Sequence, residues 1–185
     1  MQSIMINFEA NHSTMSVLII PAHSEHAAAL ATFSLEAFYD AYAYANTRTD
    51  MQQYITEHFS KEEIRKEIET VNTFIFLALI DGSIAGYAKL GTATSPEQLN
   101  GKSAIEIERL YVDKKLQSQK VGAALMEHII QFSKSQGKKI IWLGVWKKNP
   151  RAVAFYEREG FEKFGETVFT LGRDLQEDFL MKKEI

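Results

Sequence analysis

The sequence predicts an α/β domain, and three observations carry this prediction. The dipeptide Asp81-Gly82 joins two runs of strand-forming residues, 73–80 and 84–91, which is the pattern of a tight β-hairpin. Residues 106–161 follow the order strand, polar loop, helix, strand and capped helix. The uninterrupted apolar run at 140–145 is typical of a central strand.

In the first half of the chain, residues 1–14 are polar and show no periodicity. We expect a poorly ordered extension there, followed by a single domain over residues 15–185. Ser60-x-x-Glu63 is a capping-box signature that opens a helix. The expected elements are a strand at 17–20, closed by Pro21, and helices at 24–42, 49–59 and 60–70.

In the second half, Asn149-Pro150 is an N-cap followed by proline at the first helical position, which predicts a helix that ends at Gly160. Gly137 is a natural left-handed cap for the helix before it. The other expected elements are a loop at 92–102, strands at 104–112 and 140–145, a helix at 121–136, and a last strand pair at 161–171 and 179–183.

Composition narrows the class of protein. With 185 residues, 45% hydrophobic and 24% charged, the chain is typical of a soluble globular protein with a real core. A net charge of −3 gives no reason to expect nucleic acid or an anionic membrane as partner. The absence of cysteine excludes a thiol nucleophile and thiolate metal ligands. No signal peptide is visible, so we expect a cytoplasmic protein.

The loop from Gln117 to Gly122 lies between a predicted strand and a predicted helix. A helix N-terminus offers unpaired backbone N–H groups and partial positive charge, which suits a pyrophosphate. Gly122 allows a phosphate to approach the backbone, and Ala123 keeps that face thin. Most loops of this kind bind nothing, and no Gly-Lys-Ser/Thr follows here, so this is not a nucleotide P-loop.

Asn149 and Tyr156 are seven residues apart, so on one helix they face nearly the same way. They lie about 10 Å apart along the axis and could touch two points of one extended ligand. Alternatively, Asn149 is only a cap and Tyr156 only fills the core.

Two glutamates, Glu106 and Glu108, are expected to share one face of a strand, with Ile105, Ile107 and Arg109 on the other. One interpretation is a solvated face, and the other is a general base at the open end of a cleft, acting directly or through water. The five histidines show no convincing ligand spacing, so we predict no metal site.

Three segments together resemble the GNAT superfamily of acetyl-CoA-dependent N-acetyltransferases. They are E-I-E-R-L-Y-V from Glu106, Q-S-Q-K-V-G-A-A-L from Gln117, and N-P-R-A-V-A-F-Y-E-R-E-G-F from Asn149. One departure is Lys120, which stands where the superfamily loop usually has its first glycine. If that position needs a positive φ, lysine costs about 1 kcal/mol or more there. Alternatively, the lysine reaches a phosphate of CoA.

A narrower resemblance is to the PaiA-type spermidine/spermine acetyltransferases. It rests on IEIERLYV, on IIWLGVWKKNPRAVAFY, on SLEAFYDAY in the first predicted helix, and on a C-terminal pattern formed by Gly172, Gln176, Asp178 and Met181.

The superfamily resemblance implies a mixed, mostly antiparallel central sheet of about six to seven strands with helices on both faces. It implies that the strands 104–112 and 139–145 splay apart and admit acetyl-CoA as co-substrate. It also implies that Tyr156 gives a proton to the departing thiolate and that Glu106 or Glu108 takes one from the amine. The implied cofactor-binding residues are Leu110, Tyr111, Val112, Gln117, Ser118, Gln119, Lys120, Val121, Gly122, Ala123, Asn149, Arg151 and Phe155.

For the acceptor, the resemblance implies a primary amine, and we expect a polyamine such as spermidine or spermine. Glu36 and Asp40 lie at i, i+4 on a predicted helix and would present two carboxylates to it, or form only a solvated acidic face. The alternatives are acetylation of a peptide or protein amino terminus or of an amino acid, and a non-catalytic acyl-CoA-binding sensor. The expected partner is a small-molecule amine, without nucleic acid or membrane, and the protein a monomer or homodimer.

Overall fold

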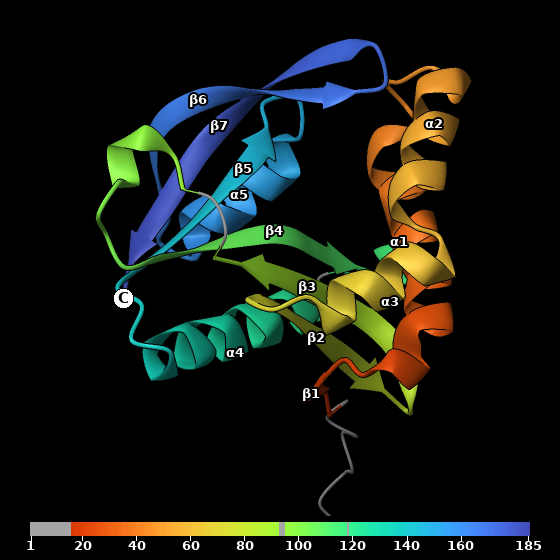
Figure 1. The fold of residues 1–185 in the computed structure, drawn as a ribbon, viewed down its shortest axis with the longest axis horizontal. Coiled ribbons are helices and arrows are strands. Elements are labelled where there is room, and N and C mark those ends of the chain that lie inside the picture. The colour runs from red at the N-terminus through yellow and green to blue at the C-terminus, as the bar shows by residue number, and fades with distance from the viewer. Residues whose placement is uncertain (1–15, 93–94, 118) are drawn as a thin grey trace, which may run out of the picture.

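A single sheet organises the computed structural model, which describes residues 16–92, 95–117 and 119–185 (Figure 1). Within these residues seven strands lie in the order β1-β2-β3-β4-β5-β7-β6. All neighbours are antiparallel except β4 and β5, which are parallel. The strands are β1 (Leu18–Pro21), β2 (Thr73–Ile80), β3 (Ser83–Gly91), β4 (Ala104–Val112), β5 (Ile140–Trp146), β6 (Glu162–Leu171) and β7 (Asp174–Glu184). The prediction of a mixed, mostly antiparallel sheet is confirmed.

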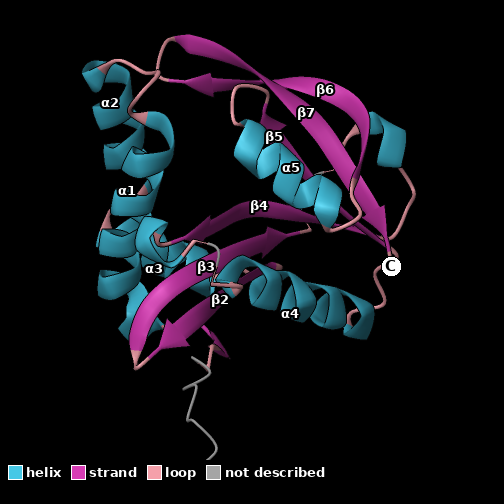
Figure 2. Ribbon diagram, turned by 180° about the vertical axis from the view of Figure 1, so that it is seen from behind, coloured by secondary structure: helices cyan, strands magenta, loops and turns pink. Residues whose placement is uncertain are grey.

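Helices cover both faces of this sheet (Figure 2). One face packs against α1 (Ala27–Tyr42), α2 (Arg48–His58) and α3 (Lys61–Glu69), around a core that includes Phe38 and Tyr87. The other face packs against α4 (Val121–Ser135) and α5 (Pro150–Arg158), around a core that includes Leu125 and Tyr156. The sheet therefore separates these two apolar cores, and each core lies between the sheet and its own set of helices.

Most element boundaries follow the local signals in the sequence. Asn149 caps α5 with its side chain, and Ser60 caps α3. Asp81 and Gly82 both have positive φ, 50° and 77°, as a type I′ hairpin turn requires. Residues 1–14, expected to be a poorly ordered extension, lie outside the described residues.

Two boundaries differ from the prediction by three residues or more. The α-helix at the start begins at Ala27, after a single 3-10 turn over Ser24–His26. The last strand begins at Asp174 and not at residue 179, because its polar first residues pair with Val168–Leu171 across a tight turn at Gly172. Backbone pairing supports this exposed part of the strand, so an apolar pattern does not mark it.

The parallel pairing of β4 with β5 is short. In the described strands only Ala104, Ile105 and Glu106 pair with β5, opposite Ile140, Ile141 and Trp142. Beyond Glu106 the two strands part, which confirms the predicted splay. The edge of β4 that faces β5 is consequently left without a strand partner over residues 107–112.

A β-bulge at Glu108 changes the faces of β4. In the β3–β4 register Lys89 lies opposite Arg109 and Leu90 opposite Ile107, so Glu108 is the extra residue. After the bulge Arg109 and Tyr111 lie on the face of α1–α3, while Ile105 and Ile107 pack in the other core. The expectation that Arg109 shares a face with the two isoleucines is therefore wrong, because strict alternation fails at a bulge.

The β6–β7 turn is held against the start of α2. Gly172 has φ 61°, and a Cβ built on it would lie 2.8 Å from the Asp50 Cα and 2.5 Å from its Oδ1. The Asp50 carboxylate, on a 95% buried residue, accepts a hydrogen bond from the Arg173 N–H at 3.1 Å. The Gln176 side chain donates to the Asn46 side chain at 2.5 Å. These contacts fix the α1–α2 connection to the far edge of the sheet.

We expect Gly172→Ala to lower the free energy of unfolding by about 2–4 kcal/mol, because backbone strain and a contact with Asp50 add together. Gly82→Ala is the matched control, since Gly82 also has positive φ but its Cβ would meet nothing within 4 Å. It should cost about 1–2 kcal/mol, the strain alone. Urea denaturation measures both, and equal losses would contradict the role of the Asp50 contact.

Candidate active site

The parting of β4 and β5 opens a cavity of about 860 Å³. Its walls come from the second half of β4, the loop before α4, the end of β5, the helix α5, and the end of α1. Segments that are distant in the sequence therefore meet at one place, on the side of the sheet where the parallel pairing stops.

Many of the residues predicted for the site line this cavity. They are Asp40, Glu108, Leu110, Tyr111, Val112, Gln117, Lys120, Gly122, Ala123, Asn149, Arg151, Phe155 and Tyr156. Four other predicted residues are not among the lining residues: Glu36, Glu106, Gln119 and Val121. Ser118 lies outside the described residues.

At one end of the cavity, the first turn of α4 is shaped for a close approach. Lys120 is the N-cap residue, in the left-handed conformation with φ 63°, so the condition under which lysine carries strain is met. A Cβ on Gly122 would lie 3.4 Å from the Phe155 ring and 3.7 Å from Val112. Gly122 thus keeps the gap between α4, β4 and α5 open.

This end of the cavity also carries exposed positive charge. The basic lining residues that are exposed are Lys114, Lys120, Arg151 and Arg158. Among the described residues none of them forms an ion pair within 4.0 Å. The helix N-terminus adds partial positive charge, so the region suits an anion with several phosphates.

Tyr156 on α5 lines the cavity and is 92% buried. Burial raises the pKa of its hydroxyl well above the usual value for tyrosine, and the nearby Tyr42 phenol adds to the rise. The hydroxyl is protonated at neutral pH, as that of an ordinary tyrosine is, and can act as a hydrogen-bond or proton donor. Tyr42 comes from the end of α1, so the phenols approach each other across the splay.

Glu108 belongs to a compact ion-pair network. Its carboxylate lies 2.8 Å from the Lys89 ammonium, and Lys89 also contacts Glu67 at 2.7 Å. Glu67 in turn binds Arg109 at 2.8 Å, and the Arg109 guanidinium lies 4.9 Å from the centre of the Phe59 ring. Two carboxylates thus balance two cationic side chains beside the cavity, and Glu108 is the carboxylate that lines it.

Sequence reasoning missed an aromatic wall of the cavity formed by Tyr42, Tyr44 and Trp146. The ring centre of Trp146 lies 5.6 Å from that of Tyr42 and 5.9 Å from that of Tyr44. The Tyr44 hydroxyl donates to the Lys148 carbonyl at 2.9 Å, which ties the α1–α2 connection to the end of β5. No local pattern joins these residues, because the contact spans about half of the chain.

Asp178 on β7 lies behind this wall, paired in register with Trp146. Its Oδ1 is buried and has no hydrogen-bond partner among the described residues. Burial raises the pKa of its carboxyl to about 6. In the sequence Asp178 stood out only as one position of the C-terminal pattern, which gave it no role.

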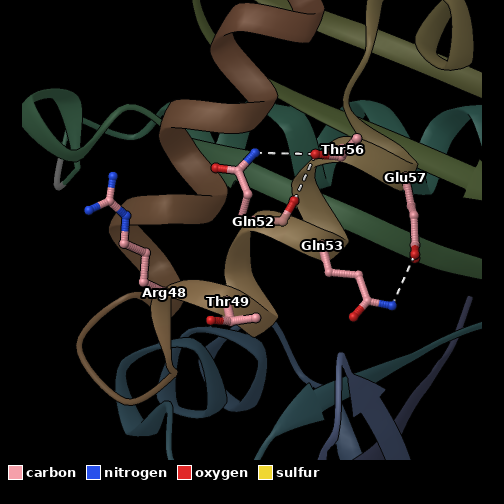
Figure 3. Close-up of a pocket in the computed structure, with 6 residues that line it drawn as sticks. All are labelled: Arg48, Thr49, Gln52, Gln53, Thr56 and Glu57. Atoms are coloured by element: carbon pink, nitrogen blue, oxygen red, sulfur yellow. Dashed lines mark hydrogen bonds between the residues drawn. The ribbon is translucent and has the colours of Figure 1, made fainter.

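A second hollow, of about 520 Å³, runs along the outer face of α2 (Figure 3). All six of its lining residues are exposed, and four of them bond in pairs through their side chains, Gln52 with Thr56 at 3.2 Å and Gln53 with Glu57 at 3.1 Å. It lacks buried titratable groups and a concave apolar wall, so it is a weaker candidate than the cavity at the splay.

Two further classes of site are absent from the described residues. In residues 16–92, 95–117 and 119–185 no group of three or more histidine, cysteine, aspartate or glutamate side chains could hold a metal ion. In the same ranges no helix is both long and apolar enough to cross a membrane.

Comparison with known proteins agrees with this geometry. The profile described as "Acetyltransferase (GNAT) family" matches residues 35–161, more than half of the chain. The chain belongs to the GNAT family of acetyltransferases. It is therefore an acyltransferase, and the cavity at the splay is the candidate active site of a GNAT enzyme.

Individual relatives are similar at different levels. An uncharacterized N-acetyltransferase in the pepI 3′ region of Lactobacillus delbrueckii subsp. lactis is 34% identical over 82% of this chain and 88% of that protein. A spermine/spermidine N(1)-acetyltransferase of Bacillus subtilis is 27% identical over 48% of this chain and 59% of its own. Among solved structures, the PaiA N-acetyltransferase of Thermoplasma acidophilum, in complex with coenzyme A, has TM-score 0.77 at 22% identity. It covers 92% of this chain and 100% of its own.

The left-handed conformation of Lys120 should lower the stability of this GNAT enzyme, and two substitutions test this. Lys120→Gly should raise the free energy of unfolding relative to Lys120→Ala by about 0.5–1.5 kcal/mol, because only glycine relieves the left-handed strain. Both variants remove the same charge, so their difference isolates the backbone. Denaturation in urea gives the comparison, and an alanine variant as stable as the glycine variant would contradict the strain.

Proposed function

We propose that this protein transfers an acetyl group from acetyl-CoA directly to a primary amine of a small cationic acceptor, such as spermidine or spermine. One observation carries the proposal: a single cavity of about 860 Å³ is lined by the basic first turn of α4, by Tyr156 and by the aromatic end of α1. A long anionic donor and a small amine could enter from the two ends and meet at Tyr156.

The donor end fits acetyl-CoA. The pyrophosphate would lie on the first turn of α4, with Lys114, Lys120 and Arg151 near its charge. The pantetheine arm would lie along Leu110–Val112, whose edge toward β5 lacks a strand partner in the described sheet. The Asn149 side chain accepts the Ala152 N–H at 3.1 Å, and this places its amide at the cavity wall, within reach of the arm.

The chemistry needs two proton transfers. An acceptor amine with a pKa near 10 must lose a proton before its nitrogen attacks the thioester carbon. A C–N bond then forms, the C–S bond breaks, and the departing sulfur needs a proton. The Tyr156 hydroxyl, which is protonated at neutral pH and lines the cavity, is the donor we assign to the sulfur.

A carboxylate is the base we assign to the amine. Glu108 lines the cavity, whereas Glu106 is not among its lining residues, and this favours Glu108. Its pairing with Lys89 at 2.8 Å fixes the carboxylate at the bulge, from which it could act directly or through a water molecule.

The acceptor end supports a cationic amine. Asp40 lines the cavity near the aromatic wall, while Glu36, one turn earlier on α1, is exposed and outside the lining. The relative in Bacillus subtilis named a spermine/spermidine N(1)-acetyltransferase adds support from sequence, in an alignment that covers 48% of this chain.

The role of Tyr156 is tested by Tyr156→Phe, which removes the hydroxyl and keeps the ring. We expect kcat to fall on the order of 10²–10⁴-fold, the usual contribution of a general acid, while the calorimetric Kd for CoA stays within about twofold. Tyr39→Phe is the control, because Tyr39 is 52% exposed on α1 and outside the cavity lining. If both variants keep the parental kcat, Tyr156 is not the acid.

The acceptor class is tested by thiol release from acetyl-CoA with a panel of amines. Spermidine should outcompete a neutral primary amine of similar length and peptide amino termini, and added salt should raise its KM because charge attraction is screened. Glu36→Gln with Asp40→Asn should raise the spermidine KM by about two- to fivefold, the effect of exposed ion pairs. Turnover of peptides alone would point to an amino-terminal acetyltransferase, and binding of acetyl-CoA without turnover to a sensor.

A further inference from the structure

Gly144 lies in the middle of β5 and is exposed, although its neighbours Leu143 and Val145 are buried. It lines the cavity at the point where β4 has already parted from β5. A glycine in the interior of a central strand usually marks a place where a ligand or another backbone approaches closely.

The missing side chain of Gly144 faces the Asp178 carboxylate. A Cβ built on Gly144 would lie 3.4 Å from the Asp178 Oδ2 and 3.9 Å from its Cβ. Any side chain at residue 144 would therefore stand between this carboxylate and the cavity. With glycine there, the carboxylate has an open path to the site.

Asp178 also lacks a counter-charge. Among the described residues no lysine, arginine or histidine pairs with it, and burial is the one cause of its raised pKa. Lys147, which follows Trp146, pairs instead with Glu166 at 2.8 Å and Glu177 at 3.4 Å. A half-buried carboxylate without a partner destabilises a fold, so it calls for a ligand that supplies the missing donor.

The groups around Asp178 suit a cation. Trp146 and Tyr42 lie side by side with ring centres 5.6 Å apart, and Tyr44 flanks Trp146 at 5.9 Å. The Asp178 carboxylate is close enough to Tyr42 to raise its pKa, after the larger effect of burial. Aromatic faces beside a carboxylate are a common arrangement for binding an ammonium group.

We propose that Asp178, reached past Gly144 and walled by Tyr42, Tyr44 and Trp146, binds an ammonium group of the acceptor amine. This inference rests on the proposed acetyl transfer and deepens it, because it gives the acceptor end a specific anionic anchor. Asp178 is therefore an acceptor-binding residue that lies behind the lining residues Gly144 and Trp146 and is not itself among the residues that line the cavity.

The variant Asp178→Asn tests this anchor, because it should weaken binding of the acceptor amine and leave binding of the CoA donor unchanged. The spermidine KM should rise on the order of 10- to 100-fold, the loss of a charge-assisted contact, while the KM and calorimetric Kd for the CoA donor stay within about twofold. The melting temperature of the variant should equal or exceed that of the parent, because an unpaired buried charge has been removed.

Asp174→Asn is the matched control. Asp174 is exposed on the same strand and pairs with Leu171 at the β6–β7 turn, whereas Asp178 pairs with Trp146, which lines the cavity. Substitution of Asp174 should therefore leave the spermidine KM unchanged. A structural aspartate at position 178 would give the opposite pattern, with a lower melting temperature and an unchanged spermidine KM. That result, or a variant that fails to fold, overturns the proposal.

Gly144→Ala gives a second, independent test. Its methyl group would make an ordinary contact with the Asp178 carboxylate and narrow the path to it. The spermidine KM should rise at least about fivefold, as expected when access to a charged partner is lost, without loss of CoA binding by calorimetry. An unchanged spermidine KM in this variant overturns the route past Gly144. Failure of the parent protein to acetylate any amine would instead reject the proposed function.

Discussion

The parallel pairing of β4 with β5 stops after Glu106, and the active site depends on this one feature. Backbone N–H and C=O groups inside a fold need partners, and a sheet that opens in its middle leaves a strand edge unpaired over residues 107–112. An extended ligand can pair with such an edge as an added strand would. The same opening exposes Gly144 and gives Tyr156 its place in the cavity wall.

The wall of the cavity formed by the end of α1 and Trp146 is held in place by contacts between residues that lie far apart in the sequence. Asp50 binds the β6–β7 turn, Gln176 binds Asn46, and Tyr44 binds the Lys148 carbonyl. These bonds fix the α1–α2 connection, so that the aromatic side chains at the end of α1 lie against Trp146. Charge is distributed differently on the two sides: the network of Glu67, Lys89, Arg109 and Glu108 is balanced, whereas the Asp178 carboxylate has no cationic partner in the described residues.

The features that were predicted correctly from the sequence are those that depend on interactions between residues close together in the chain. The cap at Asn149 and the turn at Asp81-Gly82 depend on neighbouring residues, and the part of the cavity proposed for the donor comes mostly from one stretch, residues 107–156. The part proposed for the acceptor was not predictable in this way, because Tyr42, Trp146 and Asp178 meet only through the sheet order. The face of Arg109 was predicted wrongly, because the bulge depends on pairing with β3.

Hydrogen exchange at the opened strand tests the central claim most directly. CoA should slow amide exchange in residues 107–112 and in the first turn of α4, since a bound arm and pyrophosphate would supply the missing hydrogen-bond partners. The β6–β7 turn, whose contacts with α2 lie away from the cavity, serves as the internal reference and should exchange unchanged. Saturating CoA that leaves exchange in residues 107–112 unaltered would contradict the claim that the parting of β4 and β5 forms the donor site.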